Sequence, residues 1–417
     1  MTRRATSNSS SKRWLRSADH LAIFFASMRS PAIRSRRTPR PRASRHACST
    51  RAQEAALTRI LDLTRELYNA ALQERREAWK KAGKSVTVYD QMRLLGEVKA
   101  VRPEYQGVYA QVLQETLKRL DRAFQGFFSR VKRGEKAGYP RFRGRGWWDS
   151  FTFPQVWREG NWVGPGKPLG NGKVKIPGVG HVRMKQHRPL EGVPKTFTVK
   201  RSAGCWYAVY ACDVLPQPLP PSERAVGIDL GLSHFVATSE GETFAPPKAY
   251  RQAEARLKRT QRALSRKRKG SHRRRKLKMR LARQHRKVAH QRKDFHHKLA
   301  RHLVNRYGTI VHEDLNTSGL ARSRLSKSVL DAGWSSFISI LSAKAASAGR
   351  RVVAVKPHYT SQICPQCGSI QKKELSERVH ACECGCVLDR DVAAAKVILA
   401  LGLDGALGDG QRVAASA

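Results

Sequence analysis

The chain has 417 residues, too many for one ordinary domain, so we expect two to four domains of about 100 to 200 residues each. Its 81 Lys and Arg residues outnumber 32 Asp and Glu residues, and the net charge of +49 would destabilise a compact fold unless a polyanion neutralised it. Nucleic acid is therefore the expected partner, and a hydrophobic fraction of 40% excludes a purely disordered basic tail. No apolar run reaches the roughly 18 residues that a membrane span needs, which predicts a soluble protein.

The first fifty residues are rich in Arg, Ser and Pro and contain one acid, Asp19. They show no sustained helical or strand period, so residues 1–50 are expected to be a disordered basic segment. An organellar targeting sequence has this composition. A stretch read from a non-native frame or an upstream start has it too, and that origin is favoured.

Between residues 51 and 149, apolar side chains recur at helical spacing. The run from Leu57 to Leu72 and the run from Leu113 to Val131 place them at i, i+3, i+4 and i+7, which predicts amphipathic helices. Lys and Arg occupy other faces, so the segment 51–149 is interpreted as a helical recognition bundle with a basic exterior.

The tract 132–148 mixes Gly, Pro, Arg and aromatic residues and must end the second helix. Cations alternate there with flat rings, a composition that suits both phosphate contacts and base stacking. Arg141, Arg143 and Arg145 are the candidate nucleic-acid-binding residues of this tract. The alternative is a solvated linker with a few aromatic rings directed into a core.

Hydropathy alternates with a period of two over residues 150–215, which predicts a small antiparallel β wedge or barrel. Cys205 and Cys212 are seven residues apart in one expected strand, so they point to opposite faces and act as small hydrophobic residues rather than as a disulfide. The Pro-rich segment 216–223 that follows is a linker by composition.

Residues 251–300 hold 21 Lys and Arg residues against two acids. A thin apolar stripe broken at Gly270 predicts two long basic helices over 251–303. So dense a positive charge is too repulsive for a merely solvated face, and we expect it to lie against phosphate. The candidate nucleic-acid-binding residues here are Arg266, Lys267, Arg268, Lys269, Arg273, Arg274, Arg275, Lys276, Lys278 and Arg280.

Asp229 ends an apolar strand pattern and is followed by Gly231. A buried acid at that place is costly unless it binds a metal or a hydrogen-bond donor. The glycine permits the close backbone approach that a metal site at a strand end needs. The same pattern also begins the fold of ATP-binding sugar kinases, so by itself it is a weak signal.

Two further acids follow apolar segments. Because strand neighbours face opposite ways, only one of Glu313 and Asp314 can face the site; Glu313 is preferred, and Asp314 is interpreted as a turn residue. Asp391 lies just before a helical run, where helix capping is the alternative role for it or for Asp389.

Three acids on separate elements suit two divalent cations about 4 Å apart, which activate water for phosphodiester cleavage. Mg²⁺ is the natural ion, because it is a hard cation that few carboxylates can hold. Asp229, Glu313 and Asp391 are therefore the candidate catalytic and magnesium-binding residues.

Five of the eight cysteines lie between residues 364 and 386. Two pairs of thiolates, each pair followed by Gly, are typical of a zinc ribbon whose four ligands close a tetrahedral structural site. A redox pair is disfavoured because no thioredoxin-like βαβ context surrounds the cluster. The preferred zinc ligands are Cys364, Cys367, Cys382 and Cys384, with Cys386 as the alternative to Cys382 and His380 as a weaker candidate.

The segments GIDLGLSHFVATSEG, IVHEDLNTSGL, PHYTSQICPQCG and CGCVLDRDVAAAKVIL together resemble the TnpB/OrfB proteins of bacterial insertion sequences, relatives of the compact type V CRISPR effectors. The likeness runs from about Arg51 to Leu403. It implies an α/β multidomain fold, with a RuvC-like domain of ribonuclease H fold at 224–403 and an inserted zinc ribbon at 360–388, behind the helical bundle and β wedge. Residues 404–417 would be a disordered tail.

The resemblance also implies a function. Such proteins are RNA-guided DNA endonucleases that take a guide-type RNA from the transposon end and cut DNA beside a short motif. Asp229, Glu313 and Asp391 would be the catalytic acids, and the cysteine pairs would be the ribbon. The expected location is the bacterial cytoplasm, in association with the nucleoid.

Two departures from the family pattern have consequences. The family opens with a short strand just before the first helix, whereas RPRASRHACST precedes Arg51 here, so the first wedge strand is expected to be missing. The family's D-x-N-A-A motif has Ala393 in place of Asn, which is expected to lower activity without removing a metal ligand.

Two rival functions follow from these observations. One is a TnpB-like nucleic-acid-binding protein whose cutting is weakened by the missing strand or by Ala393. The other is a DNA transposase that acts on element ends, which would also use three acids; a zinc ribbon between Glu313 and Asp391 disfavours it.

Overall fold

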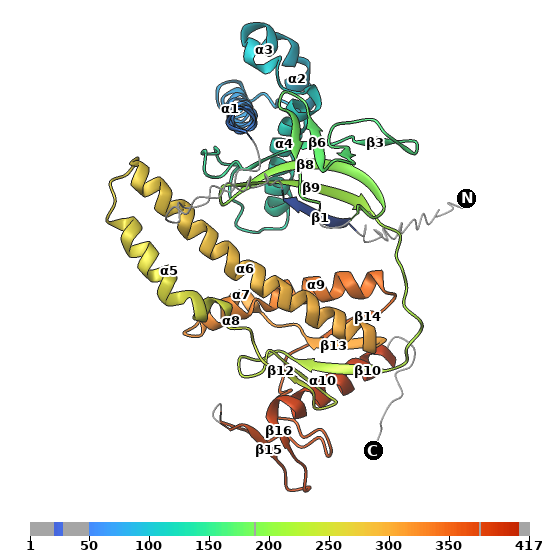
Figure 1. Ribbon diagram of the computed structural model, residues 1–417. Helices are drawn as coiled ribbons and strands as arrows, with labels where there is room; N and C mark the ends of the chain where they lie inside the picture. The colour runs from blue at the N-terminus through green and yellow to red at the C-terminus, as the bar shows by residue number, and fades with distance from the viewer. Residues whose placement is uncertain (1–20, 28–49, 187–188, 375–376, 408–417) are drawn as a thin grey trace, which may run out of the picture. The chain divides into compact units, whose positions relative to one another are not determined.

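The computed structural model describes residues 21–27, 50–186, 189–374 and 377–407, which belong to two compact units, residues 1–214 and 215–417 (Figure 1). Most of the expected disordered segments at the two ends, and Cys48, lie outside the described residues.

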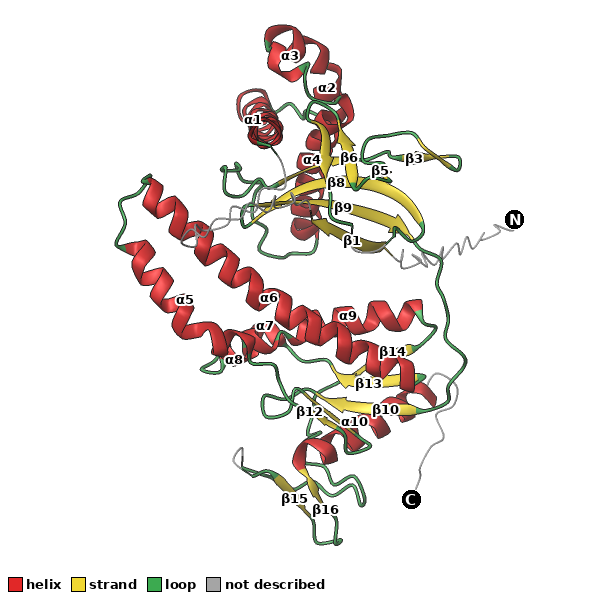
Figure 2. Cartoon of the chain, viewed as in Figure 1, coloured by secondary structure: helices red, strands yellow, loops and turns green. Residues whose placement is uncertain are grey.

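The first unit combines helices with several small sheets (Figure 2). Its helices are α1 (Arg51–Ala82), α2 (Val88–Arg93), α3 (Leu95–Val101), the 3-10 turn η1 (Pro103–Tyr105) and α4 (Ala110–Lys132). Its strands are β1 (Leu21–Ser27), β2 (Ser150–Phe153), β3 (Trp157–Arg158), β4 (Asn161–Trp162), β5 (Pro168–Leu169), β6 (Lys173–Ile176), β7 (Gly180–Arg183), β8 (Val193–Ser202) and β9 (Cys205–Asp213). The main sheet has the order β1-β9-β8-β2.

Strand β1 corrects two expectations. Leu21–Ser27 pairs antiparallel with β9 over seven residues, so this part of the segment 1–50 is not disordered and the main sheet does have a strand from before α1. The apolar run was too short to show a strand period by itself, and only its pairing with a distant strand provides hydrogen-bond partners for its backbone.

Local signals explain the long helix α1. Thr50 and Gln53 form a reciprocal capping box at its start, and Gly83 ends it in the left-handed conformation at φ 61°. The helices and the main sheet share one hydrophobic core, although their hydropathy patterns differ. Its almost completely buried side chains include Leu57 and Leu113 from α1 and α4, and Phe153, Phe197 and Tyr210 from the strands. Cys205 and Cys212 are buried free thiols, as expected.

The second unit is built around a five-stranded mixed sheet of order β12-β11-β10-β13-β14. Its strands are β10 (Ala225–Asp229), β11 (Val236–Thr238), β12 (Thr243–Phe244), β13 (Thr309–Glu313) and β14 (Arg351–Val355), with a separate ribbon of β15 (Val379–Ala381) and β16 (Val387–Asp389). Its helices are α5 (Ala249–Ser265), α6 (His272–Arg306), α7 (Thr317–Leu320), α8 (Ser326–Ala332), α9 (Trp334–Ser347) and α10 (Arg390–Leu407). Because α10 continues to Leu407, the start of the expected tail 404–417 is helical.

Helices cover both faces of this sheet: α6 and α9 lie on one face and α10 on the other (Figure 2). Val226 and Ile228 of β10 pack with Leu303 of α6 in the core of the first face. Gly227, between them in the strand, faces α10, and a Cβ there would lie 2.7 Å from the Leu399 nitrogen and would also meet the Ala395 carbonyl oxygen. Glycine is therefore what allows α10 to lie directly on β10.

Two long basic helices joined near Gly270 were expected, and α5 and α6 form an antiparallel pair around that residue, which has φ 84°. Their contact is thin, because the buried apolar cluster there consists of Ala249, Leu257 and Val288. Among the described residues, no helix is long and apolar enough to cross a membrane.

The Gly227 contact gives a stability prediction. Gly227→Ala should lower the free energy of unfolding of the second unit by at least about 1 to 3 kcal/mol, because the new methyl group meets helix backbone that cannot rotate away. Gly126→Ala, in an open position of α4, is the matched control and should be neutral or stabilising by up to about 1 kcal/mol. Urea unfolding of both variants measures the difference, and equal effects would contradict the assigned contact.

Candidate active site and metal centre

Parallel pairing brings two of the three predicted acids to one edge of the sheet. Ile228 is opposite His312 in the β10–β13 register, so Asp229 and Glu313 end neighbouring strands at the same level. Gly227 and Val311 both lie against α10, and the period of two therefore places Asp229 and Glu313 on the α10 face as well. The carboxyl ends of parallel strands are where α/β folds place ligands.

The third acid comes from the first turn of α10. Asp389 caps this helix, because its Oδ1 accepts hydrogen bonds from the Asp391 nitrogen at 2.9 Å and the Val392 nitrogen at 3.2 Å. Asp391 is therefore released from capping, and its Oδ2 lies 3.0 Å from Nδ1 of His234. Of the two acids that could cap the helix, Asp389 is therefore the cap, and Asp391 has its side chain available for other contacts.

The three acids interact electrostatically. Burial, and after it the neighbouring carboxylates of Glu313 and Asp391, together raise the pKa of Asp229 to about 8. A carboxylate that is costly to ionise among other carboxylates is a typical place for a divalent cation, which would neutralise all three. The residues present therefore fit a cation held by oxygen ligands.

Glu313 and Asp314 differ in environment as well as in direction. Glu313 is only 9% exposed and accepts a hydrogen bond from the Thr360 hydroxyl, while Asp314 is exposed and its backbone N–H donates to the Val355 carbonyl at 2.8 Å. The interior position belongs to Glu313.

Sequence reasoning missed two residues of this site, His234 and Thr360. Both belong to segments quoted for the resemblance, but no rule of spacing connects either to an acid 157 or 47 residues away. Tyr359, next to Thr360, has a positive φ of 57°, which is an unfavourable conformation for a side chain of that size.

The cysteine cluster is a four-thiol site. Ligand atoms of Cys364, Cys367, Cys382 and Cys384 lie within 4.8 Å of one another. The Sγ atoms of Cys364 and Cys384 are 3.7 Å apart, and those of Cys367 and Cys382 are 3.6 Å apart. Four thiolates about 2.3 Å from one tetrahedral ion would be about 3.8 Å apart, so the quartet has the size of a metal site.

Two further features distinguish the thiols. The Ser369 hydroxyl is hydrogen-bonded to Cys367 at 3.1 Å and to Cys382 at 3.3 Å and lowers the pKa of both, which favours the thiolate form that binds metal. Cys386 is buried and lies near His380 and near one thiol of the quartet, Cys364, but it does not group with the other three thiols.

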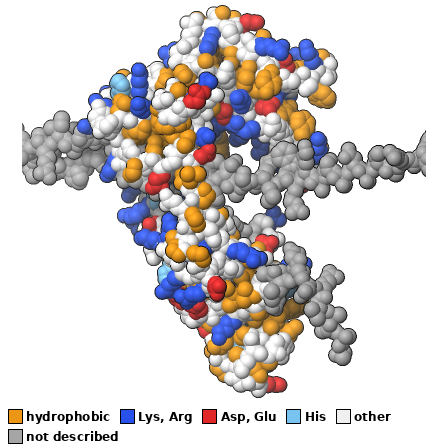
Figure 3. Space-filling model, turned by 90° about the vertical axis from the view of Figure 1, so that its right-hand side faces the viewer, with side chains coloured by type: hydrophobic (Ala, Val, Ile, Leu, Met, Phe, Trp, Pro, Cys, Tyr) orange, Lys and Arg blue, Asp and Glu red, His pale blue; other side chains and the backbone are white. Residues whose placement is uncertain are grey.

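The basic candidates on α5 and α6 are mostly free of acids. Arg274 differs from the other candidates because it has a structural role. Its guanidinium donates hydrogen bonds to the Leu264 carbonyl at 2.8 Å and the Lys267 carbonyl at 3.0 Å, and so caps the C-terminal end of α5. The remaining candidates are exposed and have no ion pair with an acid among the described residues: Arg266, Lys267, Arg268, Lys269, Arg273, Arg275, Lys276, Lys278 and Arg280. In Figure 3, Lys and Arg are spread over the visible face with only isolated acidic side chains among them.

The tract 132–148 is held on α1 of the first unit. The Asn69 side chain exchanges hydrogen bonds with the Arg143 backbone at 2.7 and 3.0 Å, and Arg145 pairs with Asp62 at 3.1 Å. Trp148 is buried, in agreement with the alternative interpretation that a few aromatic rings of this tract point into a core. Trp147, by contrast, is 82% exposed. The tract therefore combines anchored and free aromatic side chains.

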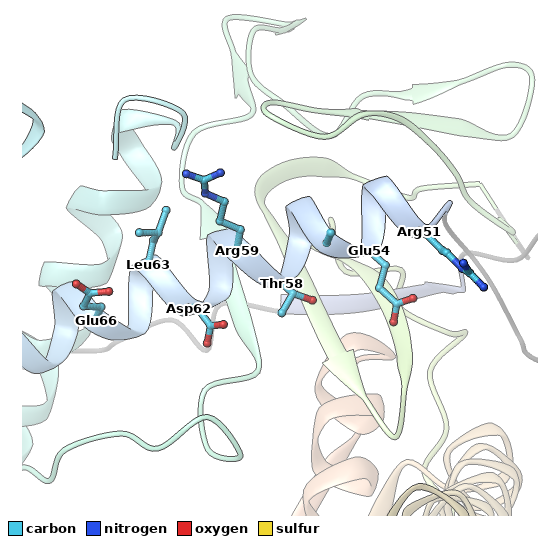
Figure 4. Close-up of a pocket in the computed structure, with 8 residues that line it drawn as sticks. Arg51, Glu54, Thr58, Arg59, Asp62, Leu63 and Glu66 are labelled. Atoms are coloured by element: carbon cyan, nitrogen blue, oxygen red, sulfur yellow. The ribbon is translucent and has the colours of Figure 1, made fainter. Parts of the chain in front are cut away.

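A shallow hollow lies on α1. It belongs to the first unit, and its side chains alternate in charge along the helix, with Glu54, Asp62 and Glu66 near Arg51 and Arg59 (Figure 4). The three acids of the candidate site all belong to the second unit.

Comparison with known proteins agrees with these features. The OrfB_IS605 profile, described as a probable transposase, matches residues 197–324; a Cas12f1-like TNB domain matches 334–398, and an OrfB helix-turn-helix domain matches 48–84. The chain is 36% identical over 377 residues to a candidate RNA-guided DNA endonuclease of Streptomyces pristinaespiralis, covering 86% of this chain and 89% of the relative. It is 32% identical over 371 residues to the similarly named InsQ of Escherichia coli (strain K12), covering 84% and 89%.

A solved structure is similar in fold. The Cas12f1 chain of a cryo-EM complex with sgRNA and target DNA aligns with a TM-score of 0.56 at 16% identity, over 83% of this chain and 82% of that chain. The matched profiles and the length of the match define a protein of the transposase-related OrfB class. This chain belongs to the TnpB/OrfB family, which confirms the resemblance expected from its sequence.

The quartet gives a prediction about metal content. Cys384→Ser should reduce bound zinc well below one ion per chain, whereas Cys386→Ser should leave it unchanged, because only Cys384 belongs to the four-thiol site. Elemental analysis of the two purified variants makes the comparison. The reverse result would make Cys386 the ligand.

The raised pKa of Asp229 gives a prediction about pH. In the metal-free chain the folded state holds a proton that an unfolded Asp, with a pKa near 3.9, releases, so stability from this group is lost as pH rises from about 4 to about 8. Asp229→Asn should therefore be more stable than the natural chain without metal, by a margin that widens from pH 5 to pH 8. Thermal unfolding across this range measures the margin, and added Mg²⁺ should stabilise the natural chain alone.

Proposed function

We propose that this protein is an RNA-guided DNA endonuclease of a transposable element, with a divalent-cation-dependent nuclease site at Asp229, Glu313 and Asp391. The observation that carries the proposal is the arrangement of these acids at two neighbouring parallel strand ends and one helix start, close enough for Glu313 and Asp391 to raise the pKa of Asp229. The relatives named for RNA-guided DNA cleavage support the reaction and its partners, DNA and a guide-type RNA.

The fold supports a RuvC-like, ribonuclease H-type domain. In the five-stranded sheet, β10 pairs antiparallel with β11 and parallel with β13, and β14 extends the parallel side. The acids end β10 and β13, next to the helix that covers that face. The thiol quartet between β14 and α10 would be the inserted zinc ribbon, with Zn²⁺ in a structural role.

The chain's own groups would perform distinct tasks in cleavage. Asp229, Glu313 and Asp391 would hold Mg²⁺, which supplies an activated water and neutralises charge at the leaving oxygen when it is bound. The Thr360 hydroxyl holds the Glu313 carboxylate, and the Asp389 cap holds the backbone of the first turn of α10, which carries Asp391.

Binding of nucleic acid would depend on other residues. The exposed cations of α5 and α6 offer contacts to backbone phosphates, which carry no sequence information. Arg141, Arg143 and Arg145, with exposed Trp147, add cations and a stacking surface. Sequence choice would then come from pairing between the guide and the DNA.

A weakened relative is the second candidate function. Ala393 lies in the first turn of α10, is 2% exposed and carries no polar group, so nothing there replaces the amide of the family's Asn. Replacement of that Asn by Ala393 would remove support for the metal site but would not remove a metal ligand. A transposase that joins DNA ends is less favoured. The profile at residues 197–324 is described as a probable transposase, but the two relatives that match over most of the chain are both named for RNA-guided DNA cleavage.

The catalytic assignment predicts two opposite results. Asp229→Ala and Glu313→Gln should abolish Mg²⁺-dependent plasmid cleavage by the chain with its RNA, while binding of nucleic acid stays within a few-fold, because the acids hold metal rather than phosphate. Asp314→Asn, next to Glu313 but exposed, should cut normally. Cutting retained in both site variants would refute the assignment.

The basic helices predict a change in salt dependence. Replacing Arg273, Lys276, Lys278 and Arg280 by Gln should reduce the slope of log affinity against log salt by up to about 3.6 units, at roughly 0.9 for each lost phosphate contact on duplex. Lys81, Arg133, Arg158 and Lys195 each pair with an acid, so a variant that replaces these four controls for net charge and should change the slope little. Equal slopes for the two variants would show that α6 is only a solvated face.

A further inference from the structure

One side chain at the candidate nuclease site, His234, has no assigned task in cleavage. His234 lies in the turn between β10 and β11, and its Nδ1 is 3.0 Å from Oδ2 of Asp391. Ligand atoms of His234, Asp389 and Asp391 all lie within 4.8 Å of one another. The contact joins two parts of the chain 157 residues apart.

The local sequence explains how the imidazole reaches Asp391. Gly231 stands between Asp229 and His234, and a Cβ on Gly231 would lie 2.8 Å from the His234 carbonyl oxygen and 3.7 Å from Oδ2 of Asp391. A glycine there lets the turn fold back tightly beside the carboxylate. The spacing from Asp229 to Gly231 to His234 therefore directs the acid and the imidazole to the same side of the sheet.

The other neighbours of Asp391 leave one task unfilled. Asp389 uses its Oδ1 to cap α10 and fixes the backbone of Asp391, but it cannot orient the Asp391 side chain because both groups are negative. Asp229, when ionised, repels that carboxylate. His234 is the neutral or cationic donor that contacts it, with a side chain 35% exposed against 17% for Asp391.

We propose that His234 is a positioning residue of the nuclease site: its Nδ1–H donates to Oδ2 of Asp391 and so fixes the direction of a carboxylate that would help to hold a divalent cation. The inference rests on the proposed function. Groups that orient a metal ligand in this way typically contribute roughly 10- to 100-fold to metal affinity.

Three substitutions separate positioning from other roles. His234→Asn keeps an N–H close to the position of Nδ1, His234→Gln moves the N–H toward the position of Nε2, and His234→Ala removes it. If Nδ1 positions Asp391, the Asn variant retains most of the affinity for a divalent cation, while the Gln and Ala variants lose roughly 10- to 100-fold. His302→Ala, which removes a histidine that contacts Glu242 at 3.2 Å, is the matched control and should have no effect.

The test measures Mn²⁺ binding by electron paramagnetic resonance on the full chain stripped of nucleic acid, with Asp229→Ala as the reference for a lost site. Thermal unfolding of each variant in the absence of metal shows whether it is folded. Unchanged Mn²⁺ affinity in folded His234→Ala would overturn the inference, and so would an Asn variant as weak as Ala. If Asp229→Ala binds Mn²⁺ and cuts DNA like the natural chain, the proposed function itself fails, which is a separate result.

Discussion

The candidate site depends on the packing of α10 against β10. Asp391 comes near Asp229 because the helix lies directly on the strand, and the helix can do so because residue 227 has no side chain. Gly402 repeats the arrangement on the next strand, where an added Cβ would meet the side chain of Val311. Backbone-to-backbone packing of this kind leaves little freedom, which suits a site whose carboxylates must hold their positions against mutual repulsion.

The cysteine ribbon is attached to this site at both of its ends. On the entering side, Thr360 contacts Glu313 four residues before Cys364, the first thiol of the quartet. On the leaving side, β16 runs directly into α10, and Arg390 donates to the carbonyls of Glu374 and Glu377 within the ribbon. A metal-stabilised ribbon would therefore hold Glu313 and Asp391, two of the three acids, in place. A structural metal would in this way affect the candidate site without taking part in catalysis.

Charge is distributed differently at the two kinds of surface. At the sheet edge, acids are concentrated and buried, so that one of them has a strongly raised pKa. On α5 and α6, cations are concentrated and exposed, with a hydrophobic contact between the helices that is too thin to account for the pair as a core element. Each arrangement is unfavourable alone and becomes favourable with a partner of opposite charge, a divalent cation in the first case and a phosphate backbone in the second.

The sequence by itself determined the features that depend on local pattern. The period of apolar residues predicted α1, α4 and the pair α5 and α6, and the spacing of cysteines predicted the quartet that the structure brings together. Periodicity and ligand spacing are properties of short segments, so a single chain displays them. The motif segments also indicated the family, and the similarity to a relative over most of the chain confirmed it.

Only the tertiary structure decided which side chains meet. Strand β1 at Leu21–Ser27 is a strand because β9 pairs with it, and its own composition gave no sign of this. The choice between Asp389 and Asp391, the capping use of Arg274, and the contacts of His234 and Thr360 all depend on neighbours 2 to 157 residues away, at distances set by the packing of complete elements. Residue types state what chemistry is available, but the direction of each side chain follows from register and helix packing, which a pattern along one chain does not contain.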